Sequence, residues 1–203
     1  MLDTTYITPV ATGVFSVVIT LITSWFKNYL DHKRLERKRG QDEQLTDKDL
    51  DSMIELSDFL DDIREKYEFD RGAIYQFHNG GKFFNGISMK KYSLTFESTS
   101  PGIVRVKEMN QNVFVTEHPV LMKHINSKDF FMVNSDDKAL DYMRDKIEEL
   151  GLLQIITVPM RTLNGSLLGF IQFSTIKAPV KITADAQRDL IESVQRIAGY
   201  LHH

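Results

Sequence analysis

The sequence predicts an α+β protein with an N-terminal transmembrane helix, a charged helical connector and an antiparallel-sheet domain. Three observations predict it. One uninterrupted apolar run lies near the start of the chain, β-rich runs separated by turn signals fill the second half, and amphipathic helical repeats flank those runs. We therefore divide the chain into residues 1–26 (tail and membrane helix), 27–45 (basic connector) and 46–203 (sheet domain).

The apolar run Ile7–Phe26 has the length of a membrane span. It contains no Asp, Glu, Lys, Arg, His, Asn or Gln, and at about 1.5 Å per residue it covers the roughly 30 Å of a bilayer core. A cleaved secretory signal fits less well. No base precedes the run, and Trp25 and Phe26 stand where such a signal would have small residues. We predict an uncleaved single span.

The charges beside the run predict its orientation. Six bases stand against two acids between Lys27 and Arg39, while the N-terminal side carries only Asp3 and the amine. The positive-inside rule then places the N-terminus outside and the domain in the cytoplasm, at a cell (inner) membrane. The bases are either a topology signal alone or also a contact for anionic headgroups; they are Lys27, Lys33, Arg34, Arg37, Lys38 and Arg39.

Small hydroxyl residues recur every four positions along the predicted span. Such a stripe lets two helices approach closely and hydrogen-bond to each other, which predicts a homodimer or a higher oligomer. The alternative is that each hydroxyl bonds back to a carbonyl of its own helix. The stripe consists of Thr8, Thr12, Ser16, Thr20 and Ser24.

The first half of the domain begins with a helix, predicted over Asp47–Tyr67 from apolar residues at helical spacing. Gly72–Phe77 is β-rich and mostly apolar, as in a central strand. His78–Gly81 contains an Asn-Gly step and predicts a turn. Apolar and polar residues then alternate over Ile87–Ser98, which predicts a half-buried strand.

The middle of the domain is the least regular part. Val104–Val106 suggests a strand, and the residues around Pro119 fit either a short helix or an extended piece. Phe130–Val133 predicts a buried strand. Ser135 caps a helix that is predicted to reach Leu150.

The end of the domain predicts a hairpin and a helix. Strands are expected over Leu152–Met160 and Leu167–Phe173, joined by a turn at Leu163–Ser166. Thr183 caps the last helix, whose apolar residues share one side. The first and last helices should cover one face of the sheet.

These last segments resemble the end of a GAF domain. The residues that carry the resemblance are VPMRTLNGSLLGFIQFS (158–174) and TADAQRDLIESVQRIAGYL (183–201). The resemblance covers about residues 47–203. It implies a cytoplasmic sensory or regulatory module that dimerises through its first and last helices. It also implies a ligand pocket between the sheet and the irregular segment, although many GAF domains bind no known ligand.

The sequence identifies no cofactor. Because Cys is absent, disulfides, thiolate metal sites and the thioether-linked bilin of some GAF domains are excluded. Cyclic-nucleotide-binding GAF domains carry a set of Asn, Lys, Phe, Asp and Glu. Here Asn79, Lys82 and Phe83 are present without the downstream members.

A polar and aromatic segment after the first strand is the candidate for binding a small-molecule ligand. Such segments are where ligand-contacting groups tend to lie. The alternative is a purely structural loop. The candidates are His78, Asn79, Lys82, Phe83, Phe84 and Asn85, together with Tyr92 on the following strand.

Other activities find little support in the sequence. We expect no catalytic residues, because neither a nucleophile elbow nor a phosphate-binding loop is present. The histidines lack metal-ligand spacing, and the net charge of −3 does not favour nucleic acid. We expect a single-pass membrane protein with a ligand- or partner-binding GAF-like domain. The alternative is a structural scaffold or pore component in which that domain is empty.

Overall fold

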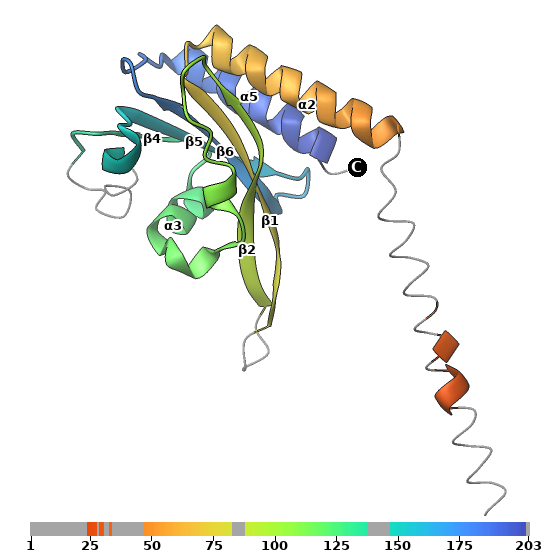
Figure 1. The fold of residues 1–203 in the computed structure, drawn as a ribbon. Coiled ribbons are helices and arrows are strands. Elements are labelled where there is room, and N and C mark those ends of the chain that lie inside the picture. Colours follow the sequence, from red (N-terminus) through yellow and green to blue (C-terminus); the bar gives the residue numbers. More distant parts are fainter. Residues whose placement is uncertain are drawn as a thin grey trace, which may run out of the picture. The chain divides into compact units, whose positions relative to one another are not determined.

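The computed structural model describes residues 24–27, 29–30, 33, 47–82, 88–137 and 147–201 (Figure 1). The chain divides into two compact units, 1–50 and 51–203. In the first unit, Trp25 stacks on Tyr29 with ring centroids 5.8 Å apart. Among the helices in the described ranges, none is long and apolar enough to cross a membrane.

Most of the membrane prediction lies outside the described residues. Of the span Ile7–Phe26, only Ser24, Trp25 and Phe26 are described, and they are helical. Lys27 and Lys33 of the basic connector are also described as helical. The remaining stripe residues and connector bases lie outside the description: Thr8, Thr12, Ser16, Thr20, Arg34, Arg37, Lys38 and Arg39.

The second unit is built on one antiparallel sheet of six strands in the order β3-β2-β1-β6-β5-β4. The α+β prediction is therefore confirmed for this domain. The strands are β1 (Arg71–Lys82), β2 (Ser88–Thr99), β3 (Val113–Phe114), β4 (Phe131–Asn134), β5 (Gln154–Arg161) and β6 (Leu167–Thr175). The named helices are α2 (Asp47–Lys66), α3 (Pro119–Ser127) and α5 (Ala184–Leu201), with 3-10 turns at Glu108–Asn110 and Val115–Glu117.

Helices α2 and α5 lie side by side on one face of the sheet, as the sequence predicts (Figure 1). They are antiparallel, because Lys66 and Tyr67 at the end of α2 both donate hydrogen bonds to Asp189 near the start of α5. Between helices and sheet lies one continuous apolar core. Its largest buried members include Leu60, Phe69, Ile74, Ile156, Met160, Ile171, Phe173, Leu190 and Ile197.

The opposite face of the sheet is covered by the irregular segment and α3. Leu121 and Ile125 of α3 pack there against a second core cluster that contains Leu94, Val133 and Ile155. Pro119 is the first residue of α3, where its missing N–H costs nothing and its fixed φ favours a helix start. Of the two alternatives left open around Pro119, the helix is correct.

The predicted turn at His78–Gly81 is wrong. β1 continues through these residues to Lys82 and pairs with β2 as a long ribbon. The strand register shifts between Asn79 and Lys82, where β1 has one residue more than β2, and Gly81 in this interval has a φ of +108°. The Asn-Gly step therefore marks a bulge, in which glycine supplies the positive φ.

Two further predictions had different outcomes. Val104–Val106 is not a strand. Val104 is 74% exposed while Val106 is buried. The Glu97 carboxylate of β2 accepts a hydrogen bond from the Val106 N–H and holds the segment, instead of a regular backbone ladder. The helix predicted over Ser135–Leu150 lies partly outside the description. Residues 135–136 form a turn and 147–150 are helical.

The strands and helices meet at two ends of the domain. At the distal pole lie the start of β1, the ends of β2 and β6, the end of α2 and the start of α5. At the proximal pole lie the early turns of α2, the last turns of α5, the β5–β6 turn (162–166) and the projecting β1–β2 ribbon.

Asp70 organises the distal pole. Its carboxylate accepts hydrogen bonds from the backbone N–H groups of Ile176 (2.6 Å) and Lys177 (3.0 Å), and the Lys177 ammonium lies 3.3 Å away. Burial acts to raise the pKa of Asp70, but these bonds outweigh burial and lower the pKa below its ordinary value. The carboxylate thus joins the end of β6 to the start of β1.

We expect Asp70→Asn to destabilise the domain by about 1–3 kcal/mol, because an amide cannot accept both bonds as a charged acceptor does. The depressed pKa adds a pH dependence. The contribution is fully present above the unfolded pKa of about 3.9 and is lost as the pH falls through the folded pKa. Urea unfolding of both proteins at neutral and acidic pH should show the difference shrinking in acid. A difference that stays constant would contradict this assignment.

Candidate functional site

Four aromatic side chains, Tyr75, Phe77, Tyr92 and Phe170, fill the space between the sheet and the α3 layer. We call them the ring cluster. Tyr75 stacks on Phe170 with centroids 4.7 Å apart, and Tyr92 meets Phe170 edge-on at 5.4 Å. Phe77 meets Tyr92 edge-on at 6.4 Å. These are favourable ring geometries, so the protein's own side chains occupy the space between the sheet and the α3 layer, where the family resemblance places a ligand.

The two tyrosines of the ring cluster are electrically neutral. Burial raises the pKa of Tyr75 far above its ordinary value, and the neighbouring Tyr92 raises it further. Burial likewise raises the pKa of Tyr92, with a smaller contribution from Glu117. Neither phenol can therefore serve as a base at physiological pH. The cluster offers apolar faces and two neutral hydroxyls, which suit binding rather than proton transfer.

The structure separates the predicted ligand residues onto two faces. His78 lies on the ribbon, with its Nε2 2.9 Å from the Ser93 hydroxyl. The Asn79 side-chain carbonyl accepts a 2.7 Å hydrogen bond from the Lys90 ammonium. Side chains alternate between the two faces of the paired strands, so Asn79 and Tyr92 lie on the face opposite His78, and Tyr92 belongs to the ring cluster. His78 therefore does not converge with Tyr92 on one cavity.

The remaining predicted ligand residues are described in part or not at all. The backbone of Lys82 pairs with Ser88 near the end of the ribbon. Phe83, Phe84 and Asn85 lie outside the described residues.

A buried ion pair, Arg71 with Glu97, was not predicted from the sequence. Arg71 Nε lies 3.2 Å from a Glu97 carboxylate oxygen, and the two side chains are only 5% and 2% exposed. The Glu97 carboxylate also accepts hydrogen bonds from the backbone N–H groups of Val106 and Lys107, at 2.9–3.1 Å. Arg71 Nη2 donates to the Val104 carbonyl at 2.7 Å. The pair thereby fixes the irregular segment along the outer edge of β2.

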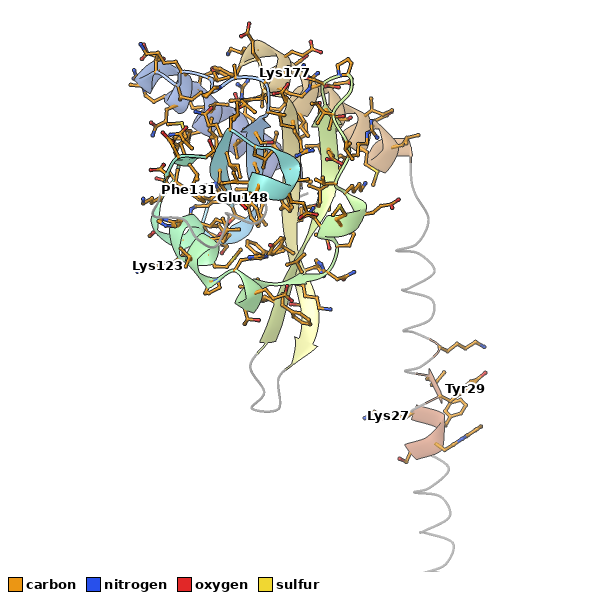
Figure 2. All side chains as sticks on the ribbon, turned by 60° about the vertical axis from the view of Figure 1, so that its left-hand side comes forward. Lys27, Tyr29, Lys123, Phe131, Glu148 and Lys177 are labelled. Atoms are coloured by element: carbon orange, nitrogen blue, oxygen red, sulfur yellow. The ribbon has the colours of Figure 1, made fainter. Side chains whose placement is uncertain are left out.

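An open cavity of about 620 Å³ lies at the distal pole. Three acids (Glu65, Glu68 and Asp70) and three bases line it, so it has no net preference for one sign of charge. Four of its charged groups already pair with other groups of the protein: Arg64, Glu65, Asp70 and Lys177. The bases are Arg64, Lys177, which Figure 2 labels, and Lys181.

A second groove, of about 600 Å³, lies at the proximal pole between the β5–β6 turn and α5. Its wall is fixed by Gln195 of α5. The Gln195 side-chain oxygen accepts from the Arg161 N–H at 3.2 Å, and its amide donates to the Pro159 carbonyl at 3.0 Å. Gln195 thus completes the strand edge beyond the end of β4. Leu163 at the tip of the turn is fully exposed.

Metal chemistry is not supported by the part of the chain that the structure describes. No group of three or more His, Asp or Glu side chains in those ranges could hold a metal ion. His124 lies 5.2 Å from the Phe131 ring. Its pKa is lowered by burial and by the neighbouring Lys128 and Lys123. It is a neutral side chain packed at the end of α3.

One antiparallel sheet, with two long helices on one face and an irregular layer on the other, is a layered α+β architecture. Comparison with solved structures makes this specific. No sequence-family model and no curated relative matches the chain, but many solved structures of GAF domains share its fold. The second unit is a GAF-like domain.

Three of these structures illustrate the similarity. The blue-light-absorbing form of the PixJ GAF domain from Thermosynechococcus elongatus superimposes with a TM-score of 0.58 at 14% identity, covering 74% of this chain and 84% of that one. GAF3 of Slr1393 from Synechocystis sp. PCC6803 gives 0.57 at 15%, covering 74% and 93%. The GAF domain region of a predicted membrane protein from Geobacter sulfurreducens PCA gives 0.53 at 12%, covering 75% and 94%. At these identities, the comparison establishes the fold alone.

Proposed function

We propose that this chain is a single-pass membrane protein whose cytoplasmic GAF-like domain is a non-catalytic regulatory module that acts through self-association. The observation that carries the proposal is an apolar surface on the early turns of α2. Met53 and Ile54 are 45% and 51% exposed there, on the side of α2 that does not pack on the sheet. Leu50, one turn earlier, is also exposed.

Three further features support this function. The GAF-like fold is common in sensory and regulatory modules. Helix α2 follows the basic connector directly in sequence, so a change in how two α2 helices pair would act on the connector and on the span predicted beyond it. The rings of the ring cluster pack against one another in the interior, where the family resemblance places a ligand.

A small-molecule ligand is a second candidate, favoured by the position of the ring cluster. The solved structures of similar fold include a far-red cyanobacteriochrome photoreceptor, and another was solved with bound biliverdin. The absence of Cys in this chain excludes a thioether link to such a pigment. A planar ligand bound without a covalent link would have to displace rings such as Tyr75 and Phe170. Native mass spectrometry of the purified protein distinguishes the candidates, since a bound ligand adds a fixed mass.

We expect the double substitution Met53→Lys/Ile54→Lys to convert the oligomer to a monomer, because it places like charges in an apolar contact. Both side chains are half-exposed, so the fold should persist. Sedimentation of the detergent-purified full chain measures the change. The matched control is Asp58→Lys, which changes charge on the same helix outside the apolar surface. An oligomer that survives the double substitution would exclude this surface, and protease protection that places the domain outside the cell would exclude the proposed topology.

A further inference from the structure

The proximal pole carries two projecting hairpins that the self-association of α2 does not use. Beyond the last β1–β6 pair, Gln76 with Gly169, the β1–β2 ribbon continues without β6 as a neighbour. Its contact with β3 is limited to Lys91 and Tyr92. Because β6 runs opposite to β1, the β5–β6 turn projects from the same end of the sheet.

The composition of these hairpins is unusual for this chain. The chain has 28 acids among 203 residues, yet residues 72–96 and 161–175 contain none. The ribbon carries Lys90 and Lys91. Lys90 is held by Asn79, and the Lys91 ammonium lies 4.4 Å from the centre of the Phe114 ring. The acids near this pole, such as Asp51 and Glu55, belong to α2.

Leu163 adds an apolar group to this basic surface. It lies at the tip of the β5–β6 turn, fully exposed, above the groove beside α5. Bases and an exposed leucine at the same end of the sheet match an anionic membrane surface, where cations pair with headgroups and apolar side chains enter the interface. A nucleic acid would use the bases but would gain little from Leu163.

We propose that the two hairpins of the proximal pole, rather than the acid-bearing turns of α2, dock on the anionic surface of the membrane in which the chain is anchored. The proposal rests on the membrane anchoring proposed above. The early turns of α2, which belong to the proximal pole, follow residues 27–46 in sequence, so this pole is the part of the domain joined to the basic connector. Docking requires that connector to lie along the membrane. A connector held upright as one helix would place the domain roughly 30 Å away.

The absence of native Cys permits a site-specific test. Ser166→Cys places a fluorescent label on the β5–β6 turn, and Ala178→Cys places the same label at the distal pole, where Ala178 is exposed. The full chain is incorporated into phosphatidylcholine discs with and without phosphatidylserine, with a quencher attached to the lipid. We expect quenching at position 166 to rise about threefold with phosphatidylserine and to fall with salt. Quenching at position 178 should not change.

Matched substitutions identify the side chains responsible. Lys90→Gln/Lys91→Gln and Leu163→Asp should each abolish the rise at position 166. Their controls at the distal pole, Lys181→Gln and Val104→Asp, should leave it intact. Val104 is another exposed apolar side chain, 74% exposed, and lies near Arg71. Equal quenching at both poles, no dependence on phosphatidylserine, or a label response to duplex DNA without lipid would overturn the proposal.

A separate experiment tests whether the chain is anchored in the membrane. A carbonate wash of the discs tests whether the chain is integral. If the chain is released, it is added to preformed phosphatidylserine vesicles and the label at position 166 is read again. Selective quenching there would support docking without an anchor, and its absence would overturn docking.

Discussion

Gly169→Ala is expected to destabilise the GAF-like domain by about 3 kcal/mol, at the upper end of the cost of overpacking a core. A Cβ at this position would lie 2.0 Å from the Tyr75 carbonyl oxygen, 2.8 Å from Met160 Cε and 3.0 Å from Gln76 Cα. Two of these contacts are with the backbone of β1, which cannot rotate away as a side chain can. The substitution must therefore separate β1 from β6 at the centre of the sheet.

Urea unfolding followed by far-ultraviolet circular dichroism measures this loss. Gly199→Ala is the matched control, because a Cβ there meets nothing within 4 Å and the residue lies within α5. In a helix, Ala is more favourable than Gly by about 0.5–1 kcal/mol. The two substitutions should therefore move the unfolding midpoint in opposite directions. Equal midpoints would show that β1 and β6 are not packed as closely as the structure shows.

Glu97→Ala is the second large effect, with an expected loss of about 3–5 kcal/mol. The substitution removes the carboxylate that faces the Arg71 guanidinium and accepts the Val106 and Lys107 N–H groups. Arg71 would be left as a buried charge without its counter-ion, and two backbone donors would lose their acceptor. We expect the irregular segment to detach from β2 before the sheet unfolds, so its amide hydrogens should exchange faster than those of β1.

Two controls separate the ion pair from a general loss of charge. Glu65→Ala removes an acid that also pairs with an arginine, but Glu65 is 71% exposed, and such pairs contribute at most about 1 kcal/mol. The double substitution Arg71→Met/Glu97→Leu removes both buried charges and should recover most of the stability lost in Glu97→Ala. If the double variant is as unstable as the single one, the hydrogen bonds to Val106 and Lys107 dominate instead.

The sequence predicted the elements that rest on regular patterns. Helical spacing located α2 and α5, and the turn signal between two apolar runs located the β5–β6 hairpin. The apolar side of each helix must be buried against the sheet. The packing of α2 and α5 on one face of the sheet could therefore also be predicted from the sequence. The GAF-like resemblance, based on segments 158–174 and 183–201, agrees with the structural comparison.

What the sequence did not predict depends on contacts between residues far apart in the chain. Glu97 stands in a strand of alternating polarity, where a carboxylate is ordinarily solvated. Nothing local indicates that Arg71 and the N–H groups of Val106 and Lys107 surround it. The structure of the Asn-Gly step at 79–80 also cannot be predicted from the local sequence. A turn and a bulge require similar residues, and only the pairing with β2 distinguishes them.

The strand order has a consequence for the timing of folding. The β1–β2 and β5–β6 hairpins each join neighbouring segments, but β1 pairs with β6, about a hundred residues further along the chain. Closing a loop of that length is entropically costly and slow. During synthesis, the inner edge of β1, with Ile74 and Tyr75, stays unpaired until β6 has left the ribosome. This is the interval in which the nascent chain is most prone to aggregate.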